Sequence, residues 1–198
     1  MFIGTAGNAS NQLRTPYRIT LHPTTNTFYI SDYGNHRIMS YTFNINNGTL
    51  ILGDNGSGCN NTQLNNPIGL NFDLFSNSLI IANHVCNNIV RYVMNSTNWT
   101  LITGSINSLS GSISTQFNRP TDVIFDPMGN MYVADRNNHR IQFFQKDQFN
   151  GSTIAGITGR NGNNATTFDR PWSVRLDSQL NLYVADLSNH RIQKFLRY

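Results

Sequence analysis

The chain has 198 residues, of which 38% are hydrophobic, and this is enough for one compact domain that buries roughly 70% of its unfolded surface. Charged residues make up only 12%, and asparagine is abundant instead, with 30 copies. The net charge of +4, without any run of Lys or Arg, permits a nucleic acid or an anionic surface as partner but does not indicate one. No apolar stretch approaches roughly 18 residues, so the sequence predicts no membrane span.

Four similar units follow one another along the chain, at about 11–58, 62–110, 115–160 and 166–198. A proline recurs at intervals of 51, 53 and 51 residues, at Pro16, Pro67, Pro120 and Pro171. An isoleucine recurs at intervals of 51, 52 and 51 residues, at Ile38, Ile89, Ile141 and Ile192. A fixed period of this length is typical of a repeat protein.

The pattern of a complete unit predicts four short strands. In the third unit an alternating run at 121–126 precedes a DPMGN turn, a second strand at 131–135 and an RNNH turn. A third strand follows at 140–144 and a fourth near 151–156, before a link rich in Gly and Asn. Four short antiparallel strands in about 51 residues predict the blade of a β-propeller, and therefore an all-β fold.

The two ends of the chain are predicted to share a blade. Residues 1–7, MFIGTAG, match the fourth-strand segments TIAGITG and LITGSIN, whereas the last unit ends just after its third strand. A strand over residues 1–7 would therefore complete the last blade and leave no unpaired sheet edge.

The turn between the second and third strands repeats an acid, a histidine and an arginine at fixed spacing. The copies are Asp32, His36 and Arg37; Asp135, His139 and Arg140; and Asp186, His190 and Arg191. Equivalent turns on neighbouring blades should lie about 10 Å or more apart, whereas Zn–N bonds are about 2.0–2.1 Å. We therefore predict a structural turn. Asp135 can accept backbone N–H groups, Arg140 can reach a carboxylate such as Asp135, and Asn138 tolerates a left-handed backbone. No metal site and no cofactor is predicted.

The NHRI stretch after VAD resembles the NHL-repeat family, closely in the third and fourth units and well in the first, which reads YISDYGNHRI. The second unit departs from the pattern, because Asn83, Asn87 and Asn88 replace the acid, the histidine and the arginine. The resemblance covers nearly the whole chain. It implies a propeller, usually six-bladed, that binds something on one face, and family members serve many different functions.

Two arrangements of the blades follow from this resemblance. Either the four blades close directly into a ring, or they are part of a six-bladed propeller. The usual blade count of the family favours the partial propeller, as does a start that lacks the features of a signal peptide.

In a propeller the second-to-third strand turn and the link into the blade lie on one face. Cys59 lies in the link into the second unit and Cys86 in its turn, so the two should be neighbours. A disulfide and two free thiols are both compatible with this placement. A disulfide would fit an extracellular setting, as does a mild excess of N-glycosylation sequons, but the compartment stays open. The eight sequons begin at Asn8, Asn47, Asn55, Asn60, Asn95, Asn98, Asn150 and Asn164.

Ligand contacts are expected on that face at positions where the units differ, since shared positions serve the frame. The residues beside each proline and after each turn acid give a basic, aromatic set: Tyr17, Tyr33, Arg119, Arg136, Arg170 and Trp172. Such a surface suits a peptide, a glycan or single-stranded RNA, through stacking and charge.

We therefore expect a non-enzymatic platform that binds a protein or peptide, with a single-stranded RNA-binding propeller as the alternative. A metal-dependent lyase or hydrolase is the alternative from another class, and it needs converging His or carboxylate groups. One equivalent position, at the end of the first strand, holds His22, Asp73, Asp126 and Asp177. Three of these four are turn acids, so turn capping explains them more simply. No catalytic motif is present in the sequence.

Overall fold

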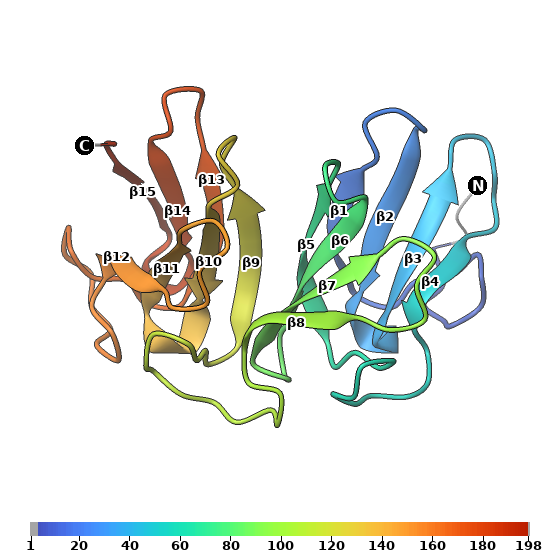
Figure 1. The fold of residues 1–198 in the computed structure, drawn as a ribbon, viewed down its shortest axis with the longest axis horizontal. Helices are drawn as coiled ribbons and strands as arrows, with labels where there is room; N and C mark the ends of the chain where they lie inside the picture. Colours follow the sequence, from blue (N-terminus) through green and yellow to red (C-terminus); the bar gives the residue numbers. More distant parts are fainter. Residues whose placement is uncertain (1–3, 198) are drawn as a thin grey trace.

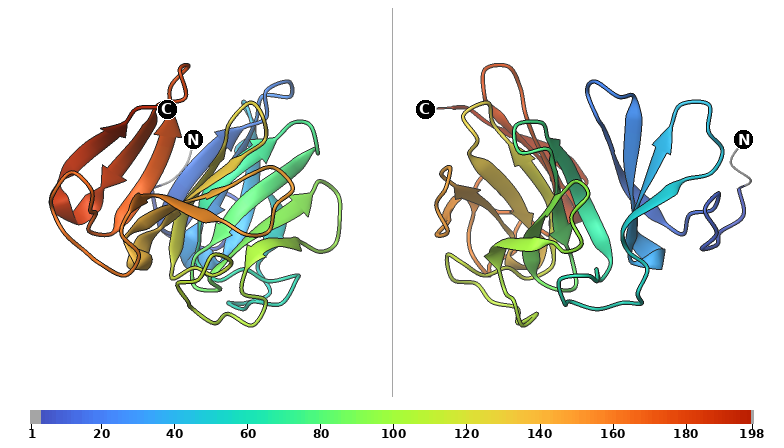
Figure 2. Two further views of the ribbon diagram at one scale, coloured as in Figure 1. Left: turned by 60° about the vertical axis from the view of Figure 1, so that its left-hand side comes forward. Right: turned by 45° about the vertical axis from the view of Figure 1, so that its right-hand side comes forward.

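The computed structural model describes residues 4–197, and in this part of the chain the fold is a four-bladed β-propeller (Figure 1). The blades are antiparallel sheets arranged in a ring around a common axis, and Figure 2 shows them fanning outward from it. The predicted all-β propeller fold is confirmed. The described residues contain no helix that is long and apolar enough to cross a membrane.

Three blades have four strands each in chain order from the axis outward. The first is β1 (Pro16–Leu21), β2 (Thr27–Asp32), β3 (Arg37–Thr42) and β4 (Thr49–Gly53). The second is β5 (Pro67–Asp73), β6 (Ser78–Asn83), β7 (Asn88–Val93) and β8 (Thr100–Gly104). The third is β9 (Pro120–Phe125), β10 (Met131–Asp135), β11 (Arg140–Phe144) and β12 (Ser152–Gly156).

The fourth blade has three strands among the described residues, β13 (Pro171–Leu176), β14 (Leu182–Asp186) and β15 (Arg191–Phe195). The expected strand at the N-terminus falls partly on residues 1–3, which lie outside the described residues, and residues 4–7 form no strand. Gly7 instead accepts a hydrogen bond from Asn35 of the first blade, because it belongs to the link that enters that blade.

Strand direction gives the propeller two distinct faces. Each innermost strand begins at a link and ends at a tight hairpin, so the links and the 3-10 turns lie at one end of the blades. This link face is the lower side of Figure 1, and the hairpins lie on the upper side. The 3-10 turns are η1 (Tyr33–Asn35), η2 (Arg136–Asn138) and η3 (Leu187–Asn189).

The repeated arginine clamps the link that enters its own blade. Arg140 Nε donates to Asp135 Oδ2 over 2.8 Å, and both side chains are almost fully buried. The guanidinium also donates to three link carbonyls, those of Ser112, Ile113 and Gln116. The first and fourth blades repeat the pair, Arg37 with Asp32 at 2.8 Å and Arg191 with Asp186 at 2.9 Å.

In the first and third blades the repeated histidine ties the turn to the following blade. His36 and His139 take the left-handed backbone, with φ of 55°, which was predicted for Asn138. The residue directly after the 3-10 turn closes it and takes the left-handed conformation, and this residue is the histidine. Its Nδ1 then accepts the N–H of the residue before the next proline, Asn66 at 3.1 Å and Arg170 at 3.2 Å.

The second blade keeps two of these contacts with asparagine. Asn87 Oδ1 accepts the N–H of Arg119 over 2.8 Å, as the histidines do in the other turns. Asn83 Oδ1 accepts the N–H of Asn65 over 2.8 Å, as the turn acids do. Asn88 is too short to reproduce the arginine clamp, and it donates to Ser105 instead.

A disulfide takes the place of the missing clamp. Cys86 occupies the turn position that is asparagine in the other blades. There the asparagine side-chain amide donates a hydrogen bond to the carbonyl of a glycine in the link, which is Gly7, Gly111 or Gly162. The equivalent glycine is Gly58, and the next residue, Cys59, is bonded to Cys86 with a Cα–Cα distance of 5.6 Å. The bond therefore joins the same turn and link that the clamp joins elsewhere.

Apolar clusters fill the three junctions between consecutive blades. On one side of each junction the repeated isoleucine is fully buried, as Ile38, Ile89 and Ile141, but Ile192 of the last blade is 67% exposed. On the other side Leu70, Val123 and Val174 are at most 1% exposed, whereas the equivalent Ile19 of the first blade is 56% exposed. The seam between the fourth and first blades therefore lacks the packing of the other junctions.

We predict that Ile141→Ala lowers the free energy of unfolding by about 2–5 kcal/mol, because it opens a cavity in a packed junction. Ile192→Ala, the same change at the seam, should alter it by less than about 1 kcal/mol. Urea unfolding of both variants measures the difference. An equal loss of unfolding free energy in both variants would contradict this prediction, because it would mean that Ile192 is buried in solution.

Candidate functional site

Three aromatic rings from the first and fourth blades meet on the link face, near the axis. Tyr17 of β1 lies edge-on to Tyr33 of η1, with ring centroids 4.9 Å apart. Tyr17 also contacts Trp172 of β13 at 5.6 Å, across the seam between the first and fourth blades. Tyr17 and Trp172 each follow the proline that starts an innermost strand, and Tyr33 follows a turn acid. All three therefore lie at the link end of their blades.

Arg136 completes this group, which we call the mouth cluster together with Tyr17, Tyr33 and Trp172. Its guanidinium carbon lies 5.5 Å from the Trp172 ring centre, at cation–π distance. Nη1 donates to Asn137 Oδ1, but Nε is buried without a hydrogen-bond partner. Burial, and then the positive charges of Arg170 and Arg119, lower the pKa of Arg136.

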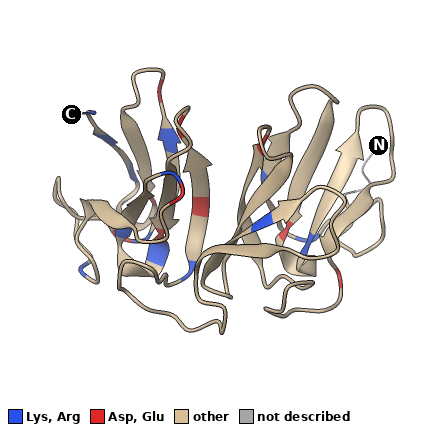
Figure 3. Cartoon of the chain, viewed as in Figure 1, with Lys and Arg blue, Asp and Glu red and all other residues tan. Residues whose placement is uncertain are grey.

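Arg119 and Arg170 border the mouth cluster. Each precedes a proline and has a positive φ, 58° and 57°, like the equivalent Thr15 and Asn66. Both are exposed, and their charges act on Arg136. The structure therefore brings four of the six predicted residues into direct contact and places the other two beside them. Figure 3 shows that Lys and Arg are scattered over the strands and loops of the ribbon, with Asp and Glu among them.

His84 lies next to the mouth cluster and was not among the predicted contacts. It follows Asn83, as Tyr33 and Arg136 follow the turn acids of their blades. It is only 5% exposed, and its ring is 6.5 Å from that of Tyr33. Nδ1 lies 3.0 Å from the Pro120 carbonyl oxygen, which can only accept, so Nδ1 carries the proton. Burial lowers the pKa of His84 to about 4, so the ring is neutral at neutral pH.

A buried carboxylate joins three innermost strands one layer beneath the cluster. Asp122 of β9 is 2% exposed. Its Oδ1 lies 3.6 Å from Arg18 Nη2 of β1, and its Oδ2 lies 2.8 Å from Arg175 Nη1 of β13. It also accepts hydrogen bonds from the Ser173 hydroxyl and the Val174 N–H. Desolvation raises the pKa of Asp122, and Arg18 opposes this rise. A charged residue in mid-strand, where neighbouring units carry Gly69 and Ser173, is the sequence signal that indicates this site.

The described residues contain no group of three or more His, Cys, Asp or Glu side chains placed to hold a metal. The repeated histidines serve the turns, as described above. The chemistry available at the mouth is therefore aromatic contact, positive charge and the donor of Arg136.

Comparisons with known proteins agree with the repeat. The NHL repeat model matches residues 117–144 and 168–195, the turn-bearing parts of the third and fourth units. A stretch of 83 residues is 34% identical to NHL repeat-containing protein 3 of Mus musculus, and the match spans 40% of this chain and 23% of that protein. The human protein of the same name matches over the same length with the same identity.

Solved structures share the architecture. A Bacteroides thetaiotaomicron protein of unknown function superposes with a TM-score of 0.73 at 18% identity, over 89% of this chain and 46% of its own. A gluconolactonase of Xanthomonas campestris superposes with a TM-score of 0.72 at 15% identity, over 96% of this chain and 60% of its own. At these identities the likeness shows the fold alone. The fold and the clamped turns thus define a β-propeller built of NHL-type units.

The third and fourth units thus match the NHL repeat, and a stretch of this chain is similar to curated NHL repeat-containing proteins.

We predict that His84 makes the fold less stable in mild acid. Its pKa is lower in the folded state, about 4, than the ordinary value of 6.5, so unfolding takes up a proton between these pH values. The free energy of unfolding should fall by up to roughly 3 kcal/mol as the pH drops from 6.5 to 4. His84→Leu, which introduces the residue of the fourth unit, should remove this share of the slope. Identical slopes for the two proteins, measured by urea unfolding across this range, would contradict the assignment.

Proposed function

We propose that this propeller is a non-enzymatic platform whose mouth cluster binds a protein partner through a peptide segment. The observation that carries the proposal is Arg136, whose Nε is buried without a partner beside the Trp172 ring. A buried donor without an acceptor is unfavourable, so an acceptor supplied by a ligand would stabilise it.

The neighbouring groups indicate what the peptide carries. Arg119 and Arg170 add positive charge, and among the described residues neither they nor Arg136 form an ion pair with a carboxylate. Tyr17 is 47% exposed and Trp172 is partly exposed, so flat apolar surface lies beside the charge. An acidic segment with aromatic or proline side chains would match both features.

Single-stranded RNA is a second ligand that this surface favours, because stacking on aromatic rings and contact with arginine also suit bases and phosphates. The two ligands differ in their response to salt. RNA affinity should fall steeply between about 50 and 200 mM salt, whereas a peptide held by ring contacts should respond less.

The enzyme hypothesis has less support from the residues in place. Asp126 accepts hydrogen bonds from the N–H groups of Met128 and Asn130 and from the Asn130 amide, and Asp177 has the same pattern. His22 packs on Phe72 with ring centres 4.3 Å apart. These contacts support turn capping and packing, at the end of the blades away from the mouth cluster.

The setting we propose is extracellular. The Cys59–Cys86 disulfide is the observation for it, since disulfides persist in oxidising compartments.

The test uses peptides selected from a random twelve-residue phage library on the immobilised protein. Binding is followed by Trp172 fluorescence in the Trp99→Phe background, because Trp99 is buried and is the other tryptophan. We expect Trp172→Ala and Arg136→Met to weaken binding at least about tenfold, in line with hot-spot aromatic and arginine residues. The Trp172→Ala titration is read by calorimetry.

Arg160→Met is the matched control, since Arg160 is an exposed link arginine outside the cluster. It should leave the affinity unchanged. Selected peptides that bind Trp172→Ala and Arg136→Met as well as the parent protein would refute the proposed site. Tighter binding of a twelve-uridine RNA, with a steep salt response, would replace the peptide by RNA.

A further inference from the structure

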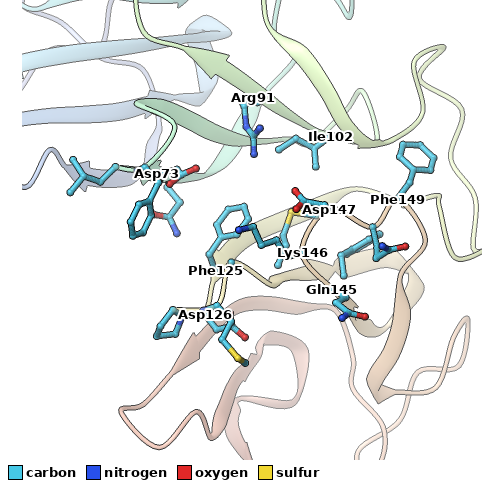
Figure 4. Close-up of a pocket in the computed structure, with 18 of the residues that line it drawn as sticks. Asp73, Arg91, Ile102, Phe125, Asp126, Gln145, Lys146, Asp147 and Phe149 are labelled. Atoms are coloured by element: carbon cyan, nitrogen blue, oxygen red, sulfur yellow. Dashed lines mark hydrogen bonds between the residues drawn. The ribbon is translucent and has the colours of Figure 1, made fainter.

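A cavity of about 690 Å³ lies between the second and third blades, at the hairpin end and thus away from the mouth cluster. In Figure 4 Arg91 and Ile102 project into it from the second blade. Phe125 and Lys146 line the opposite wall, on the third blade, and Asp73 lies at the hairpin edge. Pockets of 300–1,000 Å³ are the usual size for small-molecule sites.

The cavity coincides with a break in the repeat. Three blades carry a tyrosine at the same position of the second strand, Tyr29, Tyr132 and Tyr183, and the second blade carries Ile80. Ile80 is fully buried in the junction beneath and has no ring to extend toward the hairpin end. The second blade therefore lacks an aromatic ring that the other three supply.

The tyrosines make three kinds of contact in the other blades. Tyr29 stacks on Phe72 of the following blade, with centroids 5.5 Å apart and planes 4° from parallel. Lys194, opposite Tyr183 in the strand register, places Nζ 5.2 Å from its ring centre. The hydroxyl groups of Tyr132 and Tyr183 donate to the hairpin acids of their own blades, at 3.4 and 3.2 Å.

The cavity contains the counterpart of each of these partners. Phe125 is the third-blade equivalent of Phe72, and Arg91 lies opposite Ile80 in the register, as Lys194 lies opposite Tyr183. Asp73 is the hairpin acid of the second blade. The Nε of Arg91 is buried without a hydrogen-bond partner. Among the described residues Asp73 Oδ2 accepts a hydrogen bond only from the Ser76 hydroxyl, and a carboxylate oxygen has room for a second donor.

We propose that this cavity is a binding site for a ligand that carries a 4-hydroxyphenyl ring. The ring stacks on Phe125 and lies against the Arg91 guanidinium, which prefers an aromatic face. The phenolic hydroxyl donates to Asp73, as the tyrosines do to the acids of their own blades. The cavity is larger than one ring, so the rest of the ligand occupies the space beside Lys146 and Ile102. The ring comes either from a free phenolic molecule or from a tyrosine side chain of a peptide.

The test is a titration of the ¹⁵N-labelled protein with p-cresol, followed by NMR. The Arg91 Nε–H signal should move upfield, because a ring above the guanidinium shields it, and shifts should concentrate on residues that line the cavity. Toluene, which lacks the hydroxyl, should bind about tenfold more weakly, the effect of one hydrogen bond to a charged acceptor. No p-cresol shift at these residues up to 10 mM, or equal binding of toluene, would overturn the proposal.

Two variants locate the site. Ile80→Tyr restores the residue of the other blades and should abolish p-cresol binding by filling the cavity. Asp73→Asn should remove most of the preference for p-cresol over toluene. Lys194→Met is the matched control, at the Arg91 position of the fourth blade, and should bind p-cresol as the parent protein does. A folded Ile80→Tyr protein that binds p-cresol unchanged, or an Asp73→Asn protein that keeps the preference, would refute the assignment.

A titration with a second probe distinguishes the two sources of the ring. N-acetyl-tyrosinamide reproduces a tyrosine side chain with its flanking peptide groups. Stronger binding of this probe than of p-cresol supports a peptide source, and weaker binding supports a free phenolic molecule. Both outcomes require shifts at Arg91, and their absence with both probes contradicts the proposal.

Discussion

The buried pair of a turn aspartate and an arginine five residues later is the contact on which the rest of this propeller depends. It holds the turn of each clamped blade against the link that enters that blade, through Asp135 and Arg140 in the third. Removing one partner of such a buried pair typically costs about 3–5 kcal/mol, because it leaves a charge without compensation. The clamp fixes the link, the link sets the start of the innermost strand, and the strand starts bring Tyr17 and Trp172 together at the mouth.

The positions where the units depart from one another carry the features that distinguish this protein. In the second blade a disulfide occupies the place of the clamp, and Ile80 occupies the place of a tyrosine. At the mouth the residues that follow the three turn acids and Asn83 all differ, and two of them, Tyr33 and Arg136, belong to the cluster. Shared positions therefore build the frame, and varied positions define the two proposed sites.

The sequence predicted the fold well because its period and its strand pattern are local signals. Strand order alone places the prolines and turns at one end, which is why the sequence could group the six residues there, whereas their role in binding stays a prediction. The sequence could not predict that Arg136 Nε lacks a partner, because burial depends on the neighbouring blade. The cavity was missed for the same reason, as a replaced tyrosine becomes visible only when the facing Phe125 is placed. The left-handed residue was assigned to Asn138 instead of His139, because propensity favours asparagine but the 3-10 turn fixes the position.

The most direct test of the clamp is to rebuild it in the second blade of a protein without the disulfide. Cys59→Ser with Cys86→Asn should lower the free energy of unfolding by about 3–4 kcal/mol, the usual effect of opening a 27-residue loop. Adding Asn83→Asp and Asn88→Arg to that protein restores the motif of the other blades. We expect denaturant unfolding to show that this variant regains most of the lost free energy of unfolding. No gain, or a further loss, would contradict the claim that clamp and disulfide do the same work.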